Sequence, residues 1–217
     1  DGVSFEIGAG EIVGLVGESG SGKSITGFSI LGLVDAPGRI VGGEILFKGT
    51  DLKTLPAAEM QKMRGSSIAM IFQDPMMTLN PVLRIETQMI EAIQTHDSSV
   101  SKDEARQRSR DALGLVGISS PEERMRAYPH QFSGGMRQRV SIAIAMLNRP
   151  DLIIADEPTT ALDVTIQGQV IHEMQKLCKK TKTALLWITH DLAVVAGISS
   201  RICVMYALSL IHISEPT

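Results

Sequence analysis

A short stretch near the start of the chain has the composition and spacing of a phosphate-binding loop. The pattern G-x-x-x-x-G-K-[ST] is matched by Gly17-Glu18-Ser19-Gly20-Ser21-Gly22-Lys23-Ser24, between an apolar run and a stretch with helical periodicity. Glycines let successive backbone amides turn toward a triphosphate at a helix N-terminus, where the helix dipole favours anions. We expect Lys23 to reach the β- and γ-phosphates of ATP and the Ser24 hydroxyl to ligate Mg²⁺.

Two adjacent carboxylates end a second apolar run, Leu152-Ile153-Ile154-Ala155-Asp156-Glu157. Beside a phosphate-binding loop, such a segment organises Mg²⁺, so we expect Asp156 to hold the metal or its water shell. Glu157 is then placed to accept a proton from the attacking water. Taken alone, an apolar strand that ends in Asp-Glu is more often a strand that meets solvent. The functional interpretation therefore depends on the loop.

A second candidate anion site precedes an almost uniformly apolar helix. The segment is Phe132-Ser133-Gly134-Gly135-Met136-Arg137-Gln138-Arg139. Ser133 can cap the helix while free backbone amides face outward. The alternative is a capped helix with a purely structural role.

The elements that carry these residues alternate between strand and helix, which is typical of an α/β core. Apolar runs predict strands at 11–16, 44–47, 68–72, 152–155, 184–189 and 202–205, with weak alternation at 3–7. Helical periodicity predicts helices at 23–33, 85–94, 102–115, 134–148 and 164–178. Strand signals are missing between Gln73 and Gln131, so we interpret this region as an inserted helical subdomain.

Composition excludes several classes of function. The chain has 217 residues, of which 43% are hydrophobic and 21% charged, and a net charge of -3. This acidic balance gives no electrostatic footprint for nucleic acid. Cys178 and Cys203 lie far apart without metal-ligand spacing, so neither a zinc site nor a disulfide framework is expected.

The most apolar stretch, 202–213, is shorter than the ~20 residues of a membrane span. The chain begins at Asp1 without a leader, so we expect a fragment.

Taken in order, these motifs resemble those of the ABC ATPases. The phosphate-binding loop, the Ser-Gly-Gly-Met-Arg-Gln-Arg segment and Asp-Glu-Pro-Thr-Thr-Ala-Leu-Asp follow one another as in that family, and Ser133-Gly134-Gly135 looks like its signature motif. The resemblance implies a RecA-like P-loop NTPase core at 1–73 and 132–207, a helical subdomain at about 74–131 and a partial N-terminal antiparallel β subdomain.

The resemblance also assigns roles that the residues alone do not. Gln73 looks like the Q-loop glutamine, which senses Mg²⁺, Asp163 like the D-loop aspartate, and His190 like the switch histidine, which contacts the γ-phosphate. Without the family, Gln73 and His190 are more often structural. The family implies a dimer, homo- or heteromeric, in which the signature of one protomer covers the ATP of the other. Its other implied partners are membrane-spanning permease subunits and, indirectly, a solute-binding protein.

Three segments resemble the branch of importers for oligopeptides, dipeptides and nickel. They are Gln73-Asp74-Pro75-Met76-Met77-Thr78-Leu79-Asn80-Pro81, Tyr128-Pro129-His130-Gln131 and Leu162-Asp163-Val164-Thr165-Ile166-Gln167. The expected function is that of the ATP-hydrolysing subunit of a peptide importer, peripheral on the cytoplasmic face of the bacterial inner membrane. A nickel importer, a soluble ABC ATPase that acts on nucleic acid and an inert fragment are the alternatives. Residues 208–217 depart from the family and are expected to be a non-native tail.

Overall fold

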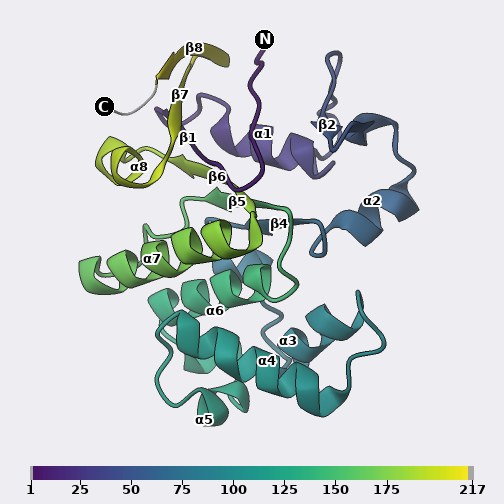
Figure 1. Ribbon diagram of the computed structural model, residues 1–217, viewed down its shortest axis with the longest axis vertical. Helices are drawn as coiled ribbons and strands as arrows, with labels where there is room; N and C mark the ends of the chain where they lie inside the picture. Colours follow the sequence, from purple (N-terminus) through teal and green to yellow (C-terminus); the bar gives the residue numbers. More distant parts are fainter. Residues whose placement is uncertain (1, 215–217) are drawn as a thin grey trace.

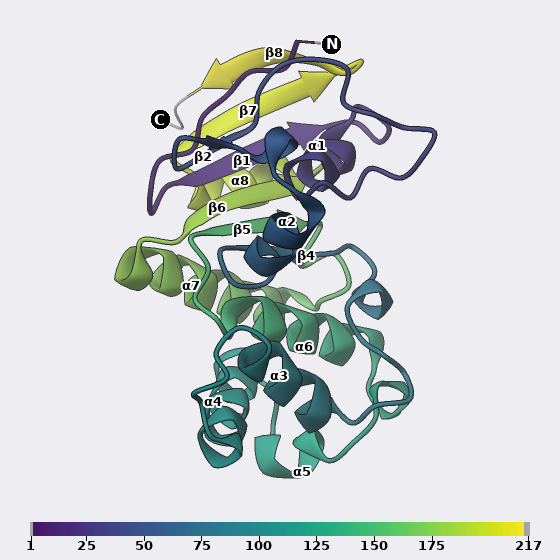
Figure 2. The same ribbon diagram turned by 90° about the vertical axis from the view of Figure 1, so that its right-hand side faces the viewer.

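The computed structural model describes residues 2–214, with side chains for residues 2–211. The main sheet consists of β1 (Ile12–Gly17), β4 (Ile68–Ile71), β5 (Leu152–Asp156), β6 (Ala184–Thr189), β7 (Arg201–Tyr206) and β8 (Ser209–Ser214). Their order is β4-β5-β6-β1-β7-β8 (Figures 1 and 2). Neighbours from β4 to β7 run parallel, and β8 pairs antiparallel with β7.

Continuous burial of the central strands explains why they are readable as unbroken apolar runs. All of β5 and β6 is buried, and so is β1 except for its last residue. A parallel sheet covered on both faces by helices leaves no polar face to alternate with the apolar one. The strands expected at 11–16, 68–72, 152–155, 184–189 and 202–205 are confirmed within one residue at each end.

The two faces of the sheet bury separate apolar clusters. On one face, Val13 and Leu15 belong to the cluster that α1 (Lys23–Ile30) covers with Phe28. On the other face, the cluster takes in apolar residues of α6 (Gly134–Met146), α7 (Val164–Thr181) and α8 (Leu192–Ile198). Figure 1 shows α1 and these three helices on opposite sides of the strands. The helices α1 and α6 therefore pack on opposite faces of the sheet.

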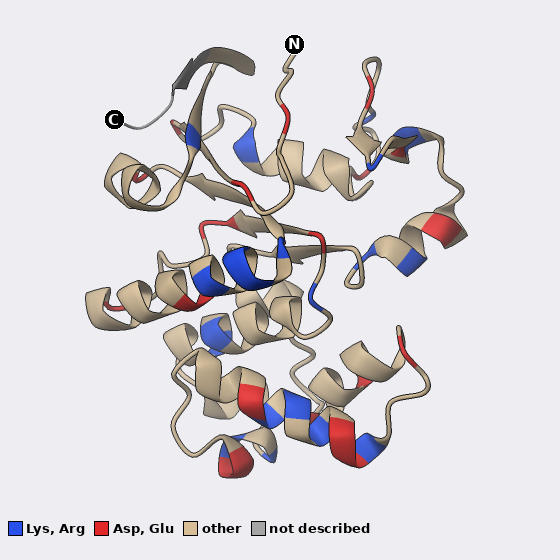
Figure 3. Ribbon diagram, in the orientation of Figure 1, with Lys and Arg blue, Asp and Glu red and all other residues tan. Residues whose placement is uncertain are grey.

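Between β4 and α6 lie three helices, α3 (Ile85–Gln94), α4 (Lys102–Leu115) and α5 (Pro121–Met125), and no strand is assigned within this wholly described region. The helices expected at 85–94 and 102–115 are confirmed with the same bounds. Ile85, Met89 and Ile93 form one buried stripe of α3. The outer surface of α4 carries interspersed basic and acidic residues (Figure 3), as expected for a solvated face.

Several short helices were not expected from the sequence. They are α2 (Ala57–Met63), α5, α8 and the 3₁₀ turns Leu52–Thr54, Pro75–Met77 and Pro129–Gln131. None exceeds two turns, so apolar periodicity has too few positions to register. Three expected helices also differ at their ends, and one of them is α6, which stops at Met146 rather than at residue 148. The helix α1 stops at Ile30 rather than residue 33, close to Gly32 with its φ of 61°, and α7 continues to Thr181.

The strand expected at 3–7 is wrong, because the structure assigns no strand there. The alternation is real nonetheless. Val3, Phe5 and Ile7 are partly buried against the α1-side cluster, whereas the residues between them are exposed. These residues have no paired strand beside them. In the first part of the chain, the antiparallel pairing that the structure assigns is the hairpin of β2 (Leu46–Phe47) and β3 (Thr50–Asp51).

The tail expected at 208–217 contributes β8 to the sheet edge, and its last residues, 215–217, lie outside the described part of the chain. The unpaired backbone of β7 would otherwise be an open edge. Any extended segment can satisfy such an edge through backbone hydrogen bonds. The non-native origin of this tail therefore stays a prediction.

An ion pair fastens the start of β1 to β7. Arg201 Nε donates to Glu11 Oε1 at 2.6 Å, and Nη2 donates to Oε2 at 3.1 Å. The same guanidinium donates to the Glu6 carbonyl at 2.7 Å, and the Gly8 amide donates to Glu11 Oε2 at 2.6 Å. Hydrogen bonding from Arg201 lowers the pKa of Glu11 more than burial raises it. The glutamate thus holds both its own turn and a distant strand.

We expect Glu11→Gln to lower the free energy of unfolding by about 1–2 kcal/mol at neutral pH, because charge-assisted hydrogen bonds in a sheltered pair are lost. The pKa of Glu11 is lower in the folded state than in the unfolded chain. The ion pair therefore contributes fully to the free energy of unfolding above the ordinary glutamate pKa of about 4.3, and this contribution disappears as the pH falls through the pKa of the folded state. Urea unfolding of wild type and variant across this range should converge at the acid end. Glu44→Gln, at an exposed glutamate, is the control, and a gap that persists in acid would contradict the assignment.

Candidate functional site

The loop after β1 arches over the N-terminus of α1, as its sequence predicts. Gly20 and Gly22 have φ values of 80° and 98°, a region that side-chain-bearing residues rarely adopt. Gly22 occupies the N-cap position of α1 and supplies no side-chain cap. The first backbone amides of the helix are therefore left for an external acceptor.

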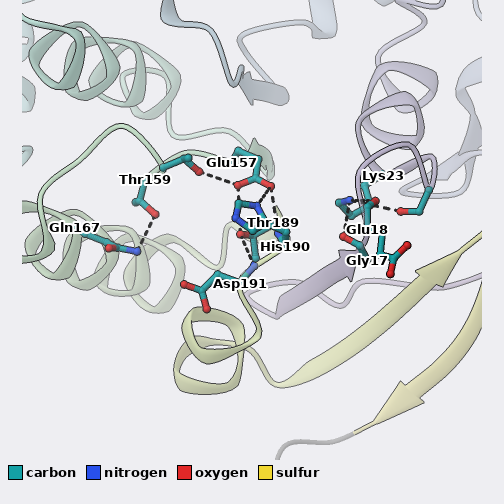
Figure 4. A network of polar contacts seen from close by, with 11 residues as sticks. Gly17, Glu18, Lys23, Glu157, Thr159, Gln167, Thr189, His190 and Asp191 are labelled. Atoms are coloured by element: carbon teal, nitrogen blue, oxygen red, sulfur yellow. Dashed lines mark hydrogen bonds and ion pairs between the residues drawn. The ribbon is translucent and has the colours of Figure 1, made fainter.

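Lys23 folds back onto this loop. Its Nζ donates to the carbonyl oxygens of Gly17 at 2.8 Å and Glu18 at 2.7 Å, and to Ser21 Oγ at 3.4 Å (Figure 4). The side chain is only 7% exposed. A sheltered ammonium needs such acceptors. Carbonyl oxygens hold it by dipoles alone, so an anionic oxygen would be a stronger partner.

Asp156 ends β5 beside this loop. It is 3% exposed, and burial raises the pKa of its carboxyl group, while a hydrogen bond with Ser24 and the charge of Lys23 lower it. Its Oδ1 has no hydrogen-bond partner in the described structure. A buried carboxylate oxygen without a donor, next to a hydroxyl, suits a hard cation such as Mg²⁺. No group of three or more His, Cys, Asp or Glu that could hold a metal ion occurs in the described region. The carboxylate of Asp156 and the hydroxyl of Ser24 are oxygen donors, which suit Mg²⁺ when phosphate oxygens and water supply its other ligands.

Glu157 follows Asp156 in a left-handed backbone conformation, with φ of 49°. Its amide donates to the Ile188 carbonyl at 2.9 Å, which fixes this conformation against β6. Thr160 Oγ1 donates to Glu157 Oε2 at 2.7 Å, and the His190 amide donates to Oε1 at 3.1 Å. His190 Nδ1 lies 2.7 Å from the same Oε1 (Figure 4). The carboxylate is thus held on both oxygens.

The sheet topology brings these groups to one edge. Gly17, Asp156 and Thr189 are the last residues of β1, β5 and β6. These strands are parallel, with β6 between the other two. Their carboxyl ends therefore meet where ligands bind in open α/β sheets. Gln73 follows the end of β4 at the same edge and is exposed.

The start of α6 stands apart from this group. Ser133 caps α6 by accepting from the Met136 amide at 3.3 Å, and both Ser133 and Gly134 are exposed. Among the described residues, no hydrogen bond or ion pair joins 133–135 to the loop at 17–24. Asp163 caps α7 by accepting from the Ile166 amide at 3.1 Å and is also exposed. One chain therefore presents two separate sets of candidate residues.

Some contributors were not found by sequence reasoning. Thr160 and Thr189 both lie within hydrogen-bond reach of Glu157 Oε2, at 2.7 Å and 3.5 Å. His190 was expected to face a phosphate, whereas here it pairs with Glu157. Threonines near an acidic pair carry no distinctive spacing. Only the packing of β5 beside β6 shows that they converge.

Comparisons with known proteins agree with this geometry. Residues 1–160 match the family model described as "ABC transporter". The chain is 51% identical over 212 residues to the oligopeptide transport ATP-binding protein OppD of Bacillus subtilis, covering 97% of this chain and 59% of that protein. It is 49% identical over 215 residues to the dipeptide transport ATP-binding protein DppD of Escherichia coli, covering 99% and 65%. The chain thus spans about three fifths of the length of such relatives.

Solved structures are similar over nearly the whole chain. The dimeric structure of MJ0796, described as a bacterial ABC transporter cassette, superposes with a TM-score of 0.90 at 28% identity, covering 99% of this chain and 89% of that one. A post-hydrolysis dimer of the same cassette, bound to ADP and Pi, gives a TM-score of 0.87 at 27% identity, with the same coverage. These likenesses place the described sheet and helices in a known cassette architecture.

We expect Asp156→Asn to raise the free energy of unfolding of the nucleotide-free chain by about 1 kcal/mol at neutral pH, because a neutral amide avoids burying an incompletely paired charge. Thermal unfolding without nucleotide or divalent cation measures this change. Asp35→Asn, at an exposed aspartate, should leave stability unaltered. A clear loss of stability in Asp156→Asn would show that the carboxylate has a structural role instead.

Proposed function

The chain belongs to the ABC transporter family, and from this membership we propose that it is the ATP-binding and ATP-hydrolysing subunit of a peptide importer. The observation that carries the enzymatic part is the buried Asp156, whose Oδ1 has no hydrogen-bond partner in the described structure and which ends β5 at the same sheet edge as the phosphate-binding loop. The peptide part rests on likeness to relatives named for oligopeptide and dipeptide transport.

In the proposed nucleotide complex, the backbone amides of 17–24 hold the phosphates of ATP at the N-terminus of α1. Lys23 exchanges the carbonyl oxygens of Gly17 and Glu18 for the β- and γ-phosphate oxygens. Its side chain already lies over the loop, so the exchange needs little movement and replaces neutral acceptors with charged ones.

For the metal, we propose Ser24, Asp156 and Gln73 as the residues that hold it or its water shell. The unpartnered Oδ1 of Asp156 supports this assignment. When bound, Mg²⁺ would neutralise charge on the β- and γ-phosphate oxygens. Gln73 lies at the same sheet edge on an exposed segment, from which it can approach or leave the nucleotide.

Glu157 is the proposed general base. Water attacks the γ-phosphorus, the bond from that phosphorus to the β–γ bridging oxygen breaks, and the water proton passes to Glu157, giving ADP and phosphate. Both oxygens of Glu157 already accept hydrogen bonds. The His190 amide and ring lie at Oε1, and Thr160 and Thr189 lie at Oε2, so these contacts take up the four lone-pair sites of the carboxylate. One contact must therefore give way before the carboxylate can receive a proton. The ring of His190, whose side chain is 65% exposed, is the contact best able to turn away, toward the γ-phosphate.

A second copy or a related subunit is proposed to complete the site. In one chain, Ser133 and Gly134 are exposed and Gly135 is partly buried at the start of α6, and among the described residues none of the three makes a hydrogen bond to the phosphate-binding loop. Helix N-termini attract phosphate, so the 133–135 segment of one protomer can cover ATP held by the other, with Asp163 alongside. The γ-phosphate then lies between two helix N-termini, and its release loosens the dimer.

The proposed partners in transport are permease subunits at the cytoplasmic face of the bacterial inner membrane, and indirectly a solute-binding protein. Among the described residues, no helix combines the length and the apolarity that crossing a membrane requires. A nickel importer is the nearest alternative. A soluble ABC ATPase acting on nucleic acid is disfavoured by the net charge of -3.

We expect Glu157→Gln to retain binding of ATP while lowering kcat by about a hundredfold or more, because the amide cannot accept the proton. Lys23→Ala should instead weaken triphosphate binding itself, because a buried cationic donor is lost. Equilibrium binding of a fluorescent ATP analogue and phosphate release measure the two effects. Unaltered turnover in Glu157→Gln would remove this residue from the mechanism.

We expect the chain, produced in a bacterium that carries the matching permease genes, to sediment with membranes containing those permeases. It should leave the membrane fraction when the permeases are deleted. Recovery with ribosomes or DNA in the same fractionation would favour the nucleic-acid alternative. Recovery in neither fraction would contradict the proposed partnership.

A further inference from the structure

Gln138 is a buried polar residue in an apolar helix. It lies on α6, is 1% exposed and has Val140, Ile142 and Ala143 as buried neighbours along the helix. Its Nε2 donates to the Phe72 carbonyl at 3.3 Å, whereas its Oε1 has no hydrogen-bond partner in the described structure. A buried acceptor left unpaired lowers the stability of the fold. Packing alone would favour an apolar side chain at this position.

The carbonyl that Gln138 contacts belongs to the segment that carries Gln73. Phe72 follows β4 and immediately precedes Gln73. One turn further along α6, Ser141 Oγ donates to Thr78 Oγ1 at 3.0 Å. Gln138 and Ser141 are three positions apart on one face of the helix. This face of α6 therefore forms hydrogen bonds to the segment 72–78 at both of its ends.

The same helix begins at the second set of candidate residues. Ser133, which caps α6, lies five positions before Gln138. Five positions along an α-helix span about 7.5 Å. A shift of the Phe72 carbonyl can therefore reach the start of α6 through Gln138 and two turns or less of helix. The unpaired Oε1 adds an acceptor that a displaced backbone amide of the segment can use, which gives the contact a second possible arrangement.

We propose that Gln138 is a positioning residue that couples Gln73 to the 133–135 segment within one chain. The inference rests on the proposed function, in which Gln73 faces nucleotide on its own phosphate-binding loop and Ser133 faces nucleotide on the partner's. Gln138 then lets the occupancy of one ATP site set the position of the groups that close the other. Coupling of this kind follows from the contact with Phe72 and does not require Gln138 to touch nucleotide.

Hydrogen exchange of the full chain tests this coupling, with Mg²⁺ and a non-hydrolysable ATP analogue as the probe. The measurement is made at protein concentrations where light scattering finds only monomer, so that a partner's nucleotide cannot protect 133–141. In wild type, nucleotide should alter exchange at 17–24 and also at 133–141. In Gln138→Met, which keeps side-chain length, the change at 17–24 should remain and the change at 133–141 should fall by about threefold or more.

Two further variants keep the result interpretable. Ser141→Ala removes the hydrogen bond from α6 to Thr78. It should reduce the nucleotide-dependent change in exchange at 133–141 without abolishing it. Ile142→Val removes one buried methyl group from the same helix and should leave the response intact. An unaltered response in Gln138→Met, or an equal loss in Ile142→Val, would overturn the coupling role. No nucleotide-dependent change at 17–24 in wild type would overturn the proposed function, and the inference with it.

Discussion

The parallel pairing of β1, β6 and β5 is the constraint on which the site depends. Because the three strands run in one direction, their carboxyl ends deliver Gly17, Thr189 and Asp156 to a single edge. Residues far apart in the sequence thus come within hydrogen-bond reach, as Glu157 and His190 do at 2.7 Å. Burial of both sheet faces holds these ends rigidly, so the site is preorganised by the core.

The site contains polar groups that the core would not select for stability. Asp156 is buried with one oxygen unpaired, and Lys23 is sheltered with only neutral acceptors. Each group has unused capacity for a ligand of opposite charge. Gln138 repeats the pattern inside α6, where its unpaired Oε1 accompanies a contact with another segment. Incomplete satisfaction of buried polar groups therefore marks positions where the structure is poised to interact or to move.

Short stretches of sequence were sufficient to predict the features whose conformation depends on residues adjacent in the chain. The phosphate-binding loop, the acidic pair and the long helices α3 and α4 were all predicted, because glycine torsions, apolar runs and helical periodicity are properties of short stretches. The same local reasoning failed at 3–7, where alternation predicted a strand. Strand formation needs a partner, and the partner is not encoded in the segment itself.

By itself, the sequence predicted which residues could carry chemistry and determined most of the elements that hold them. Only the tertiary structure decided which of these residues meet. Glu157 is held by Thr160 and His190, and Gln138 reaches Phe72, because strands and helices distant in sequence pack together. The tertiary structure also placed α6 and α1 on opposite faces of the sheet. Such arrangements depend on strand order and on which face each helix covers, and these are decided by burial across the whole core rather than by any local pattern.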